Sequence, residues 1–159
     1  MPMAVNQKLS EYLDSTGKRW EPLSHTEALS SVAEARALGI DPDEVAKSLL
    51  LKSREGYALA VIPGGHRLDM HKVRDATDDK TTRLATEADL ESAFPDYELG
   101  AAPPAPGLLN LRGFVDPTVR SREWIVFAAG THTDSVRMRT ADLIGLSDFT
   151  EADLVEAGE

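Results

Sequence analysis

Two apolar runs, Ser48-Leu-Leu-Leu-Lys52 and Tyr57-Ala-Leu-Ala-Val-Ile62, flank the four residues Ser53-Arg-Glu-Gly56. Short runs of this composition are typical of β-strands, and a short polar connection that contains Gly is typical of a hairpin turn. We therefore expect a β-hairpin over residues 48–62. The fold class follows from the elements expected on either side of it.

Helical signals dominate the residues before this hairpin. Apolar spacing predicts a first helix over residues 5–16, which the following Gly ends, and residues 19–23 can form a short strand. Ser24 begins a Ser-x-x-Glu capping box, so we expect a second helix from there to a stop at Gly39. A further short helix is predicted over residues 41–44, where Asp, Pro and Glu occupy positions that favour helix starts.

Shorter elements are expected after the hairpin. We predict helices over residues 68–76, from the capping residue Thr86 to about Phe94, and from Thr140 onward, with strands at 83–85, 113–116, 124–128 and 135–138. Three prolines forbid regular structure over residues 99–108. Because helices cluster early and strands late, we expect an α+β fold, a single compact domain over residues 1–159 with a mixed, barrel-like sheet flanked by helices.

Composition limits the function. The chain of 159 residues has no Cys, so disulfides, thiolate metal sites and a Cys nucleophile are excluded. No apolar run approaches the ~20 residues of a membrane span, and no signal peptide is recognisable, so we expect a cytoplasmic protein. The net charge of −10 argues against a general nucleic-acid binder. Residues 47–83 carry a net +3, however, which fits contact with a small part of a nucleic acid as well as it fits a solvated face.

Familiar catalytic motifs are missing. The four histidines have neither the spacing nor the carboxylate neighbours of a metal site, and the chain has no Gly-x-Ser-x-Gly elbow, Walker motif or dinucleotide glycine motif. We therefore expect no metal, no cofactor and no nucleophilic Ser.

Three features remain as candidate site elements. Lys47 precedes the apolar run of the hairpin and can point into a pocket or into solvent. The Gly-, Ala- and Pro-rich loop 100–107 can bring backbone amides close to a ligand or act as a surface connector. The segment 128–135 ends an apolar strand in a Gly turn that presents hydroxyls, an imidazole and a carboxylate, although a plain hairpin turn has the same pattern.

Six stretches in this order carry a resemblance to a known family: Ala35-Arg-Ala-Leu-Gly-Ile-Asp-Pro-Asp-Glu-Val-Ala-Lys47, Tyr57-Ala-Leu-Ala-Val-Ile-Pro63, His66-Arg-Leu-Asp69, Arg83-Leu-Ala-Thr-Glu87, Gly100-Ala-Ala-Pro-Pro104 and Phe127-Ala-Ala-Gly-Thr-His132. Together they cover about residues 20–146 and resemble the YbaK/prolyl-tRNA-synthetase-associated editing family. The resemblance implies an α+β domain without a catalytic metal that cleaves the ester of mischarged tRNA. Two departures are the extra residue in Ala105-Pro106 and Thr131 in place of the family's Ser.

The resemblance also implies site residues. It assigns catalytic roles to Lys47, Gly100 and Pro104, and substrate-binding roles to Ala101, Ala102, Pro103, Gly130, Thr131, His132 and Asp134. Lys47 matches the family's essential Lys, thought to hold the substrate's backbone or terminal phosphate. An aminoacyl ester is already activated, so positioned water and oxyanion stabilisation suffice for its hydrolysis.

These roles predict a free-standing, trans-editing aminoacyl-tRNA deacylase. Its partner is the acceptor end of a mischarged tRNA, with an aminoacyl-tRNA synthetase as a further candidate partner. Cys-tRNA and Ala-tRNA for proline are the leading substrates, followed by Ser or Thr in place of the amino acid. The alternative is a non-catalytic binding module of the same fold that senses aminoacyl-tRNA or an amino acid.

Overall fold

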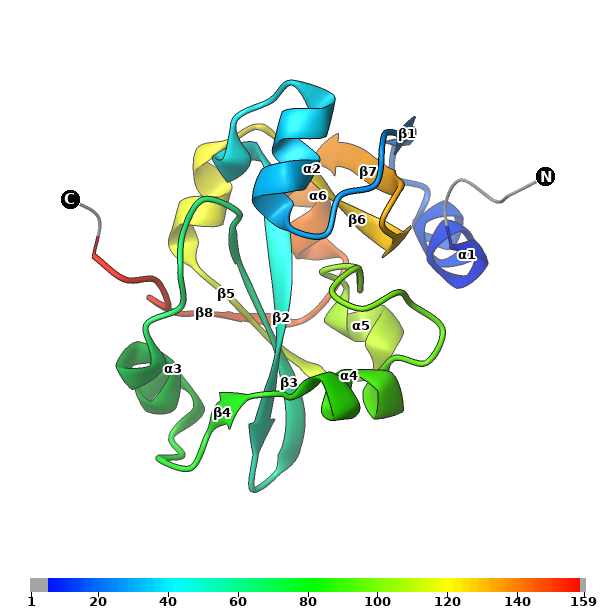
Figure 1. The fold of residues 1–159 in the computed structure, drawn as a ribbon. Helices are drawn as coiled ribbons and strands as arrows, with labels where there is room; N and C mark the ends of the chain where they lie inside the picture. The colour runs from blue at the N-terminus through cyan, green and yellow to red at the C-terminus, as the bar shows by residue number, and fades with distance from the viewer. Residues whose placement is uncertain (1–5, 158–159) are drawn as a thin grey trace.

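The computed structural model describes residues 6–157 and contains eight strands and six α-helices within that range (Figure 1). The helices are α1 (Gln7–Thr16), α2 (Ser31–Leu38), α3 (Met70–Thr77), α4 (Glu87–Ala93), α5 (Pro106–Leu109) and α6 (Thr140–Gly145), with 3-10 turns η1 (Pro42–Glu44) and η2 (Pro117–Ser121). The strands are β1 (Trp20–Ser24), β2 (Ala46–Ser53), β3 (Gly56–Pro63), β4 (Arg83–Leu84), β5 (Arg112–Val115), β6 (Trp124–Thr131), β7 (Asp134–Arg139) and β8 (Phe149–Glu151).

The strands form two sheets. A five-stranded mixed sheet has the order β4-β2-β3-β5-β8, with β5 parallel to both of its neighbours. A three-stranded antiparallel sheet has the order β1-β7-β6. A bridge between Val45 and Val126 joins the start of β2 to the middle of β6. The α+β class and the mixed sheet are therefore confirmed, but the strands do not close into one barrel.

The predicted hairpin is the centre of the larger sheet. β2 and β3 pair over their full length, from Ala46 with Pro63 to Ser53 with Gly56 (Figure 1). β3 is covered on both faces: Leu59 and Val61 belong to one apolar cluster, and Ala60 and Ile62 to another. A strand buried on both faces needs a continuous apolar run rather than an alternating one, which explains the sequence of β3.

The main core lies between the two sheets. Leu9 and Leu13 of α1 pack there against residues of β6 and β7, and Leu143 of α6 completes the cluster. α1 begins at the capping residue Asn6, whose side chain accepts a hydrogen bond from the backbone N–H of Leu9. The start at Val5 expected from the sequence lies outside the described residues.

Two local predictions were wrong. Ser24 does not cap a helix; it is the last residue of β1 and pairs with Asp134, while α2 starts later at the capping residue Ser30. Pairing with β7 thus prevailed over the local capping pattern. Residues 99–108 also contain one regular element, because Pro106 occupies the first turn of α5, where a missing N–H costs nothing.

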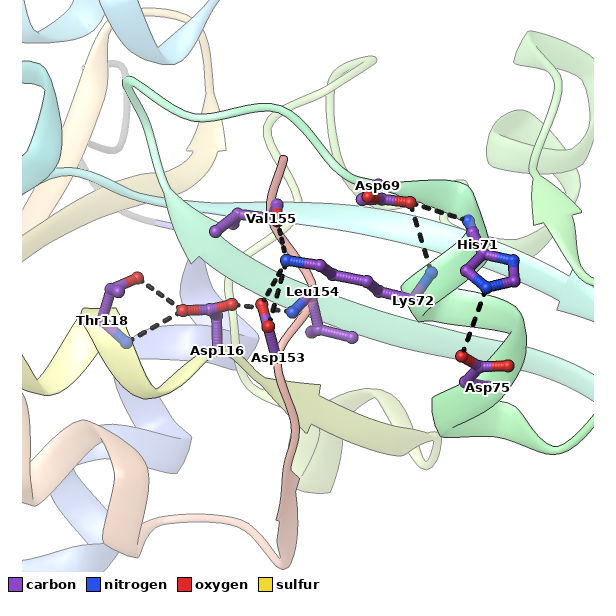
Figure 2. Close-up of polar contacts among 9 residues, drawn as sticks. All are labelled: Asp69, His71, Lys72, Asp75, Asp116, Thr118, Asp153, Leu154 and Val155. Atoms are coloured by element: carbon purple, nitrogen blue, oxygen red, sulfur yellow. Dashed lines mark hydrogen bonds and ion pairs between the residues drawn. The ribbon is translucent and has the colours of Figure 1, made fainter. Parts of the chain in front are cut away.

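The C-terminal segment was not predicted as structured. It nevertheless packs against the second apolar cluster, the one that contains Ala60 and Ile62 of β3 (Figure 2). Leu154 is fully buried, and its backbone N–H donates to the buried carboxylate of Asp116 at 2.8 Å. Lys72 of α3 donates to the carbonyl oxygen of Val155 at 2.8 Å and pairs with Asp153. Among the described residues, no helix has the length and apolar character needed to cross a bilayer.

Candidate functional site

A small cavity of about 30 Å³ lies where the start of β2 meets the end of β6. α2 and the loop between α4 and α5 flank this region (Figure 1). The cavity walls are formed by small apolar, hydroxyl and titratable residues: His25, Ala28, Leu29, Ser30, Ser31, Glu34, Ala46, Lys47, Ser48, Gly100, Ala101, Ala102, Ala128, Thr131 and His132. The space is sufficient for one or two waters or a small side chain.

Lys47 is the second residue of β2 and reaches this cavity from the sheet. η1, which Asp41 caps, delivers the chain directly into the strand. The Nζ atom of Lys47 donates to the carbonyl oxygen of Gly64 at 3.4 Å. Burial and the nearby Arg67 lower the pKa of Lys47, while Asp43 raises it in part. Lys47 is thus a partly desolvated cation suited to an anionic or carbonyl oxygen.

The loop that carries Gly100 is tied to the end of β6. The N–H of Glu98 donates to the carbonyl oxygen of Gly130, and the N–H of Gly130 donates to the carbonyl oxygen of Ala101, each at 2.9 Å. Gly100 has φ +79° and Gly130 has φ +96°, values that favour Gly. These contacts hold the small residues of the loop beside the cavity.

His132 braces the same loop. Its Nε2 lies 2.6 Å from the carbonyl oxygen of Leu99, so Nε2 carries the proton. Its backbone N–H donates to the carboxylate of Glu98 at 2.9 Å. His132 therefore both lines the cavity and fixes the position of the loop.

The cavity brings together six of the ten residues predicted from the sequence: Lys47, Gly100, Ala101, Ala102, Thr131 and His132. The other four lie next to the cavity but do not line it. Pro103 and Pro104 are buried in the same loop, and Gly130 lies near the end of β6. The carboxylate of Asp134 accepts hydrogen bonds from Thr131 at 2.7 Å and Thr133 at 2.9 Å, so it organises the turn.

Sequence reasoning missed a chain of three hydrogen-bonded side chains at the cavity wall. The hydroxyl of Ser135 in β7 contacts Nε2 of His25 at 2.9 Å and donates to the carboxylate of Glu34 in α2. Glu34 is only 5% exposed. Burial raises the pKa of Glu34, although the hydrogen bond from Ser135 and the charge of His25 lower it in part. No local pattern marks these residues, because they come from α2, from β7 and from the segment after β1, which meet only in the folded chain.

Ser48 was also missed. Its hydroxyl is buried at the cavity wall and has no hydrogen-bond partner within residues 6–157. A buried hydroxyl without a partner carries a free-energy cost, which a ligand in the cavity could remove. Across the same residues, no group of three His, Asp or Glu side chains is arranged to hold a metal ion.

Comparison with known protein families gives one match that covers most of the chain. The model of the aminoacyl-tRNA editing domain matches residues 25–146. This match confirms the resemblance read from the sequence.

A prolyl-tRNA synthetase is similar in sequence to part of this chain. A proline–tRNA ligase of Thermosipho melanesiensis is 28% identical over 111 residues, which is 69% of this chain but 19% of that ligase. The chain therefore spans about a fifth of the length of this curated relative.

Two solved structures share the fold. A candidate trans-editing enzyme for prolyl-tRNA synthetase matches with a TM-score of 0.85 at 21% identity, over 99% of this chain and 100% of that one. A hypothetical protein, APE2540, matches with a TM-score of 0.85 at 23% identity, over 94% of this chain and 100% of that one.

Proposed function

Because the chain belongs to the aminoacyl-tRNA editing domain family, we propose that it hydrolyses the ester bond of mischarged tRNA. The observation that carries this proposal is the shared cavity of Lys47, Gly100 and His132, three residues from distant parts of the chain. The acceptor end of tRNA is the proposed partner, and an aminoacyl-tRNA synthetase that delivers this tRNA is a further one.

Lys47 is proposed to bind the phosphate of the terminal adenosine or the ester carbonyl. Its position at the cavity and its partial burial support this role, because a desolvated ammonium attracts an oxyanion more strongly than a solvated one. The carbonyl oxygen of Gly64 holds Nζ only at 3.4 Å, so a substrate oxygen can replace it.

Backbone amides of the loop are proposed to stabilise the oxyanion formed when water attacks the ester carbonyl. The N–H of Ala101 already donates to the carbonyl oxygen of Glu98 at 2.9 Å. The N–H groups of Gly100 and Ala102 have no protein acceptor in the described part of the chain, so these two are the proposed donors. Fixed donors of this kind need no reorganisation during the reaction.

The size of the cavity supports a small aminoacyl group. Five alanines, Ala28, Ala46, Ala101, Ala102 and Ala128, form much of the wall, and the open volume is about 30 Å³. Cys-tRNA and Ala-tRNA for proline are therefore the first substrates to test, with Ser-tRNA next. A pocket that is already filled by a small side chain rejects a larger one by steric clash.

The test is hydrolysis of a panel of mischarged tRNAs by wild type, Lys47→Ala and Lys52→Ala. Lys52 is the matched control because it lies on the same strand but stacks over Tyr57, away from the cavity. We expect selective hydrolysis that Lys47→Ala reduces at least a hundredfold and Lys52→Ala leaves unchanged. Equal rates for wild type and Lys47→Ala would contradict the proposed role. Binding of the tRNAs without hydrolysis would instead indicate a sensing module.

A further inference from the structure

Glu34 is the only acid among the described residues that line the cavity. One carboxylate oxygen of Glu34, Oε2, accepts the hydroxyl of Ser135. The second oxygen, Oε1, has no hydrogen-bond partner in the described part of the chain and is not fully enclosed, and Glu34 lines the cavity. A buried carboxylate with one free oxygen at a small pocket is suited to a hydrogen-bond donor that carries positive charge.

The hydrogen bonds among His25, Ser135 and Glu34 limit how many protons these three side chains hold. Nδ1 of His25 lies 2.7 Å from the carbonyl oxygen of Thr26, which can only accept, so Nδ1 carries a proton. Ser135 has one hydroxyl proton for its two contacts, with Glu34 and with Nε2 of His25. Both contacts are satisfied only when one more proton lies either on Glu34 or on Nε2 of His25.

The total charge of the three side chains is the same for both proton positions. The charge of the Glu34 carboxyl group at the cavity differs between them. With the proton on Glu34 the carboxyl group at the cavity wall is neutral, and burial favours this form. With the proton on His25 the wall presents an ionised carboxylate. A cationic group in the cavity therefore contacts an ionised carboxylate once the proton has moved from Glu34 to His25 by way of the Ser135 hydroxyl. This shift does not change the total charge of the three side chains.

The cavity wall thus carries one carboxyl group, Glu34 on α2, and one ammonium group, Lys47 on β2. An aminoacyl group on a terminal adenosine has matching polarity, with an ammonium beside the ester carbonyl and a phosphate on the nucleoside. Resting on the proposed function, we propose that the carboxylate of Glu34 binds the α-ammonium group of the aminoacyl substrate. Ser135 and His25 act as positioning residues that set the proton on Glu34.

The inference is tested by binding, with no turnover required. The two probes are 3′-alanylamido-3′-deoxyadenosine 5′-monophosphate and its propionyl counterpart, which lacks only the amino group. Calorimetry with the wild type is expected to show at least tenfold tighter binding of the alanyl compound. Equal affinity for the two compounds, or no binding of either, would overturn the inference. Hydrolysis of mischarged tRNA would stand as a separate result in each case.

The variants separate recognition from structure. Glu34→Gln keeps the shape of the side chain and is expected to remove most of the tenfold preference while the propionyl affinity stays unchanged. Glu11→Gln, the same exchange at an exposed position of α1, is expected to change neither affinity. An equal loss for both compounds in Glu34→Gln indicates a merely structural role and overturns the inference.

A further arm distinguishes the source of the ammonium group. Free L-alanine has the ammonium but no adenosine, and we expect it to bind at least a hundredfold more weakly than the alanyl compound. Free alanine that binds as tightly as the alanyl compound would overturn the assignment to an aminoacyl-nucleotide. The wild-type comparisons need no variant, so the inference can be tested even if Glu34→Gln does not fold.

Discussion

His132 donates a hydrogen bond from Nε2 to the carbonyl oxygen of Leu99 at 2.6 Å, which ties the turn after β6 to the loop beside the cavity. His132→Ala removes this hydrogen bond. We expect kcat/KM for mischarged tRNA to fall at least tenfold, because the loop amides lose their fixed position, while the free energy of unfolding falls by only about 1 kcal/mol. Hydrolysis rates and urea unfolding measure the two effects. His71→Ala, at an exposed position of α3, is the control, and equal activities of the two variants would contradict the prediction.

Gly130, near the end of β6, is constrained by a close approach as well as by its backbone angle. A Cβ atom at this position would lie 2.7 Å from Cβ of Asn6 and 3.0 Å from Cδ1 of Tyr97. Gly100 also has positive φ, but a Cβ there would meet nothing within 4 Å. We expect Gly100→Ala to cost about 1–2 kcal/mol of stability from backbone strain alone, and Gly130→Ala to cost at least about 1 kcal/mol more. Urea unfolding of both variants checks this, and equal losses would refute the steric argument.

Asp116 anchors the C-terminal segment, and its contribution depends on pH (Figure 2). Burial raises the pKa of Asp116, but hydrogen bonds from Thr118 and from the backbone of Leu154 outweigh it, so the pKa is lowered overall. A lowered pKa means that the stabilisation is present above the unfolded value of about 3.9 and is lost as the pH falls through the folded value. We expect Asp116→Asn to cost about 2 kcal/mol at pH 7 and less at pH 3.

Chemical unfolding across this pH range measures the change. Asp153→Asn is the control, because Asp153 is exposed and pairs with Lys72 at the surface, where an ion pair contributes about 0–1 kcal/mol. A constant cost of Asp116→Asn from pH 7 to pH 3 would show that ionisation of Asp116 does not contribute.

Glu34 should show the opposite pH dependence. Burial raises the pKa of Glu34, so its favourable contribution is present below the unfolded value of about 4.3 and is lost as the pH rises through the folded value. Lys47 and the imidazoles of His25 and His132 line the same cavity. Relative to the wild type, Glu34→Gln should therefore be more stable at pH 8 than at pH 5, by about 1 kcal/mol. Glu11→Gln should show no such trend in the same unfolding series, and a flat difference for Glu34→Gln would contradict the prediction.

The parts of the site that the sequence predicts are those marked by local chemistry. Lys47 stands between a capped turn and an apolar run, and Gly100 begins a loop rich in Ala and Pro. Glu34 could not be predicted in this way, because it lies on α2 and its partner Ser135, 101 residues away on β7, meets it only in the folded chain. The same pairing explains why the capping pattern at Ser24 was misleading: β1 pairs with β7 at this residue, and this tertiary contact outweighs local propensity.

Under the proposed function, loop 100–107 is expected to limit the size of the aminoacyl group. Ala102 lines the cavity and is only partly buried, so Ala102→Val adds two methyl groups to the wall. If the cavity holds the aminoacyl side chain, the added volume should slow removal of Cys about tenfold more than removal of Ala, because Cys fills more of the space. Competing hydrolysis of Cys-tRNA and Ala-tRNA for proline measures this ratio. Ala76→Val on α3, which packs against the second apolar cluster, controls for the added bulk. An unchanged Cys-to-Ala ratio in Ala102→Val would place the aminoacyl side chain outside this cavity.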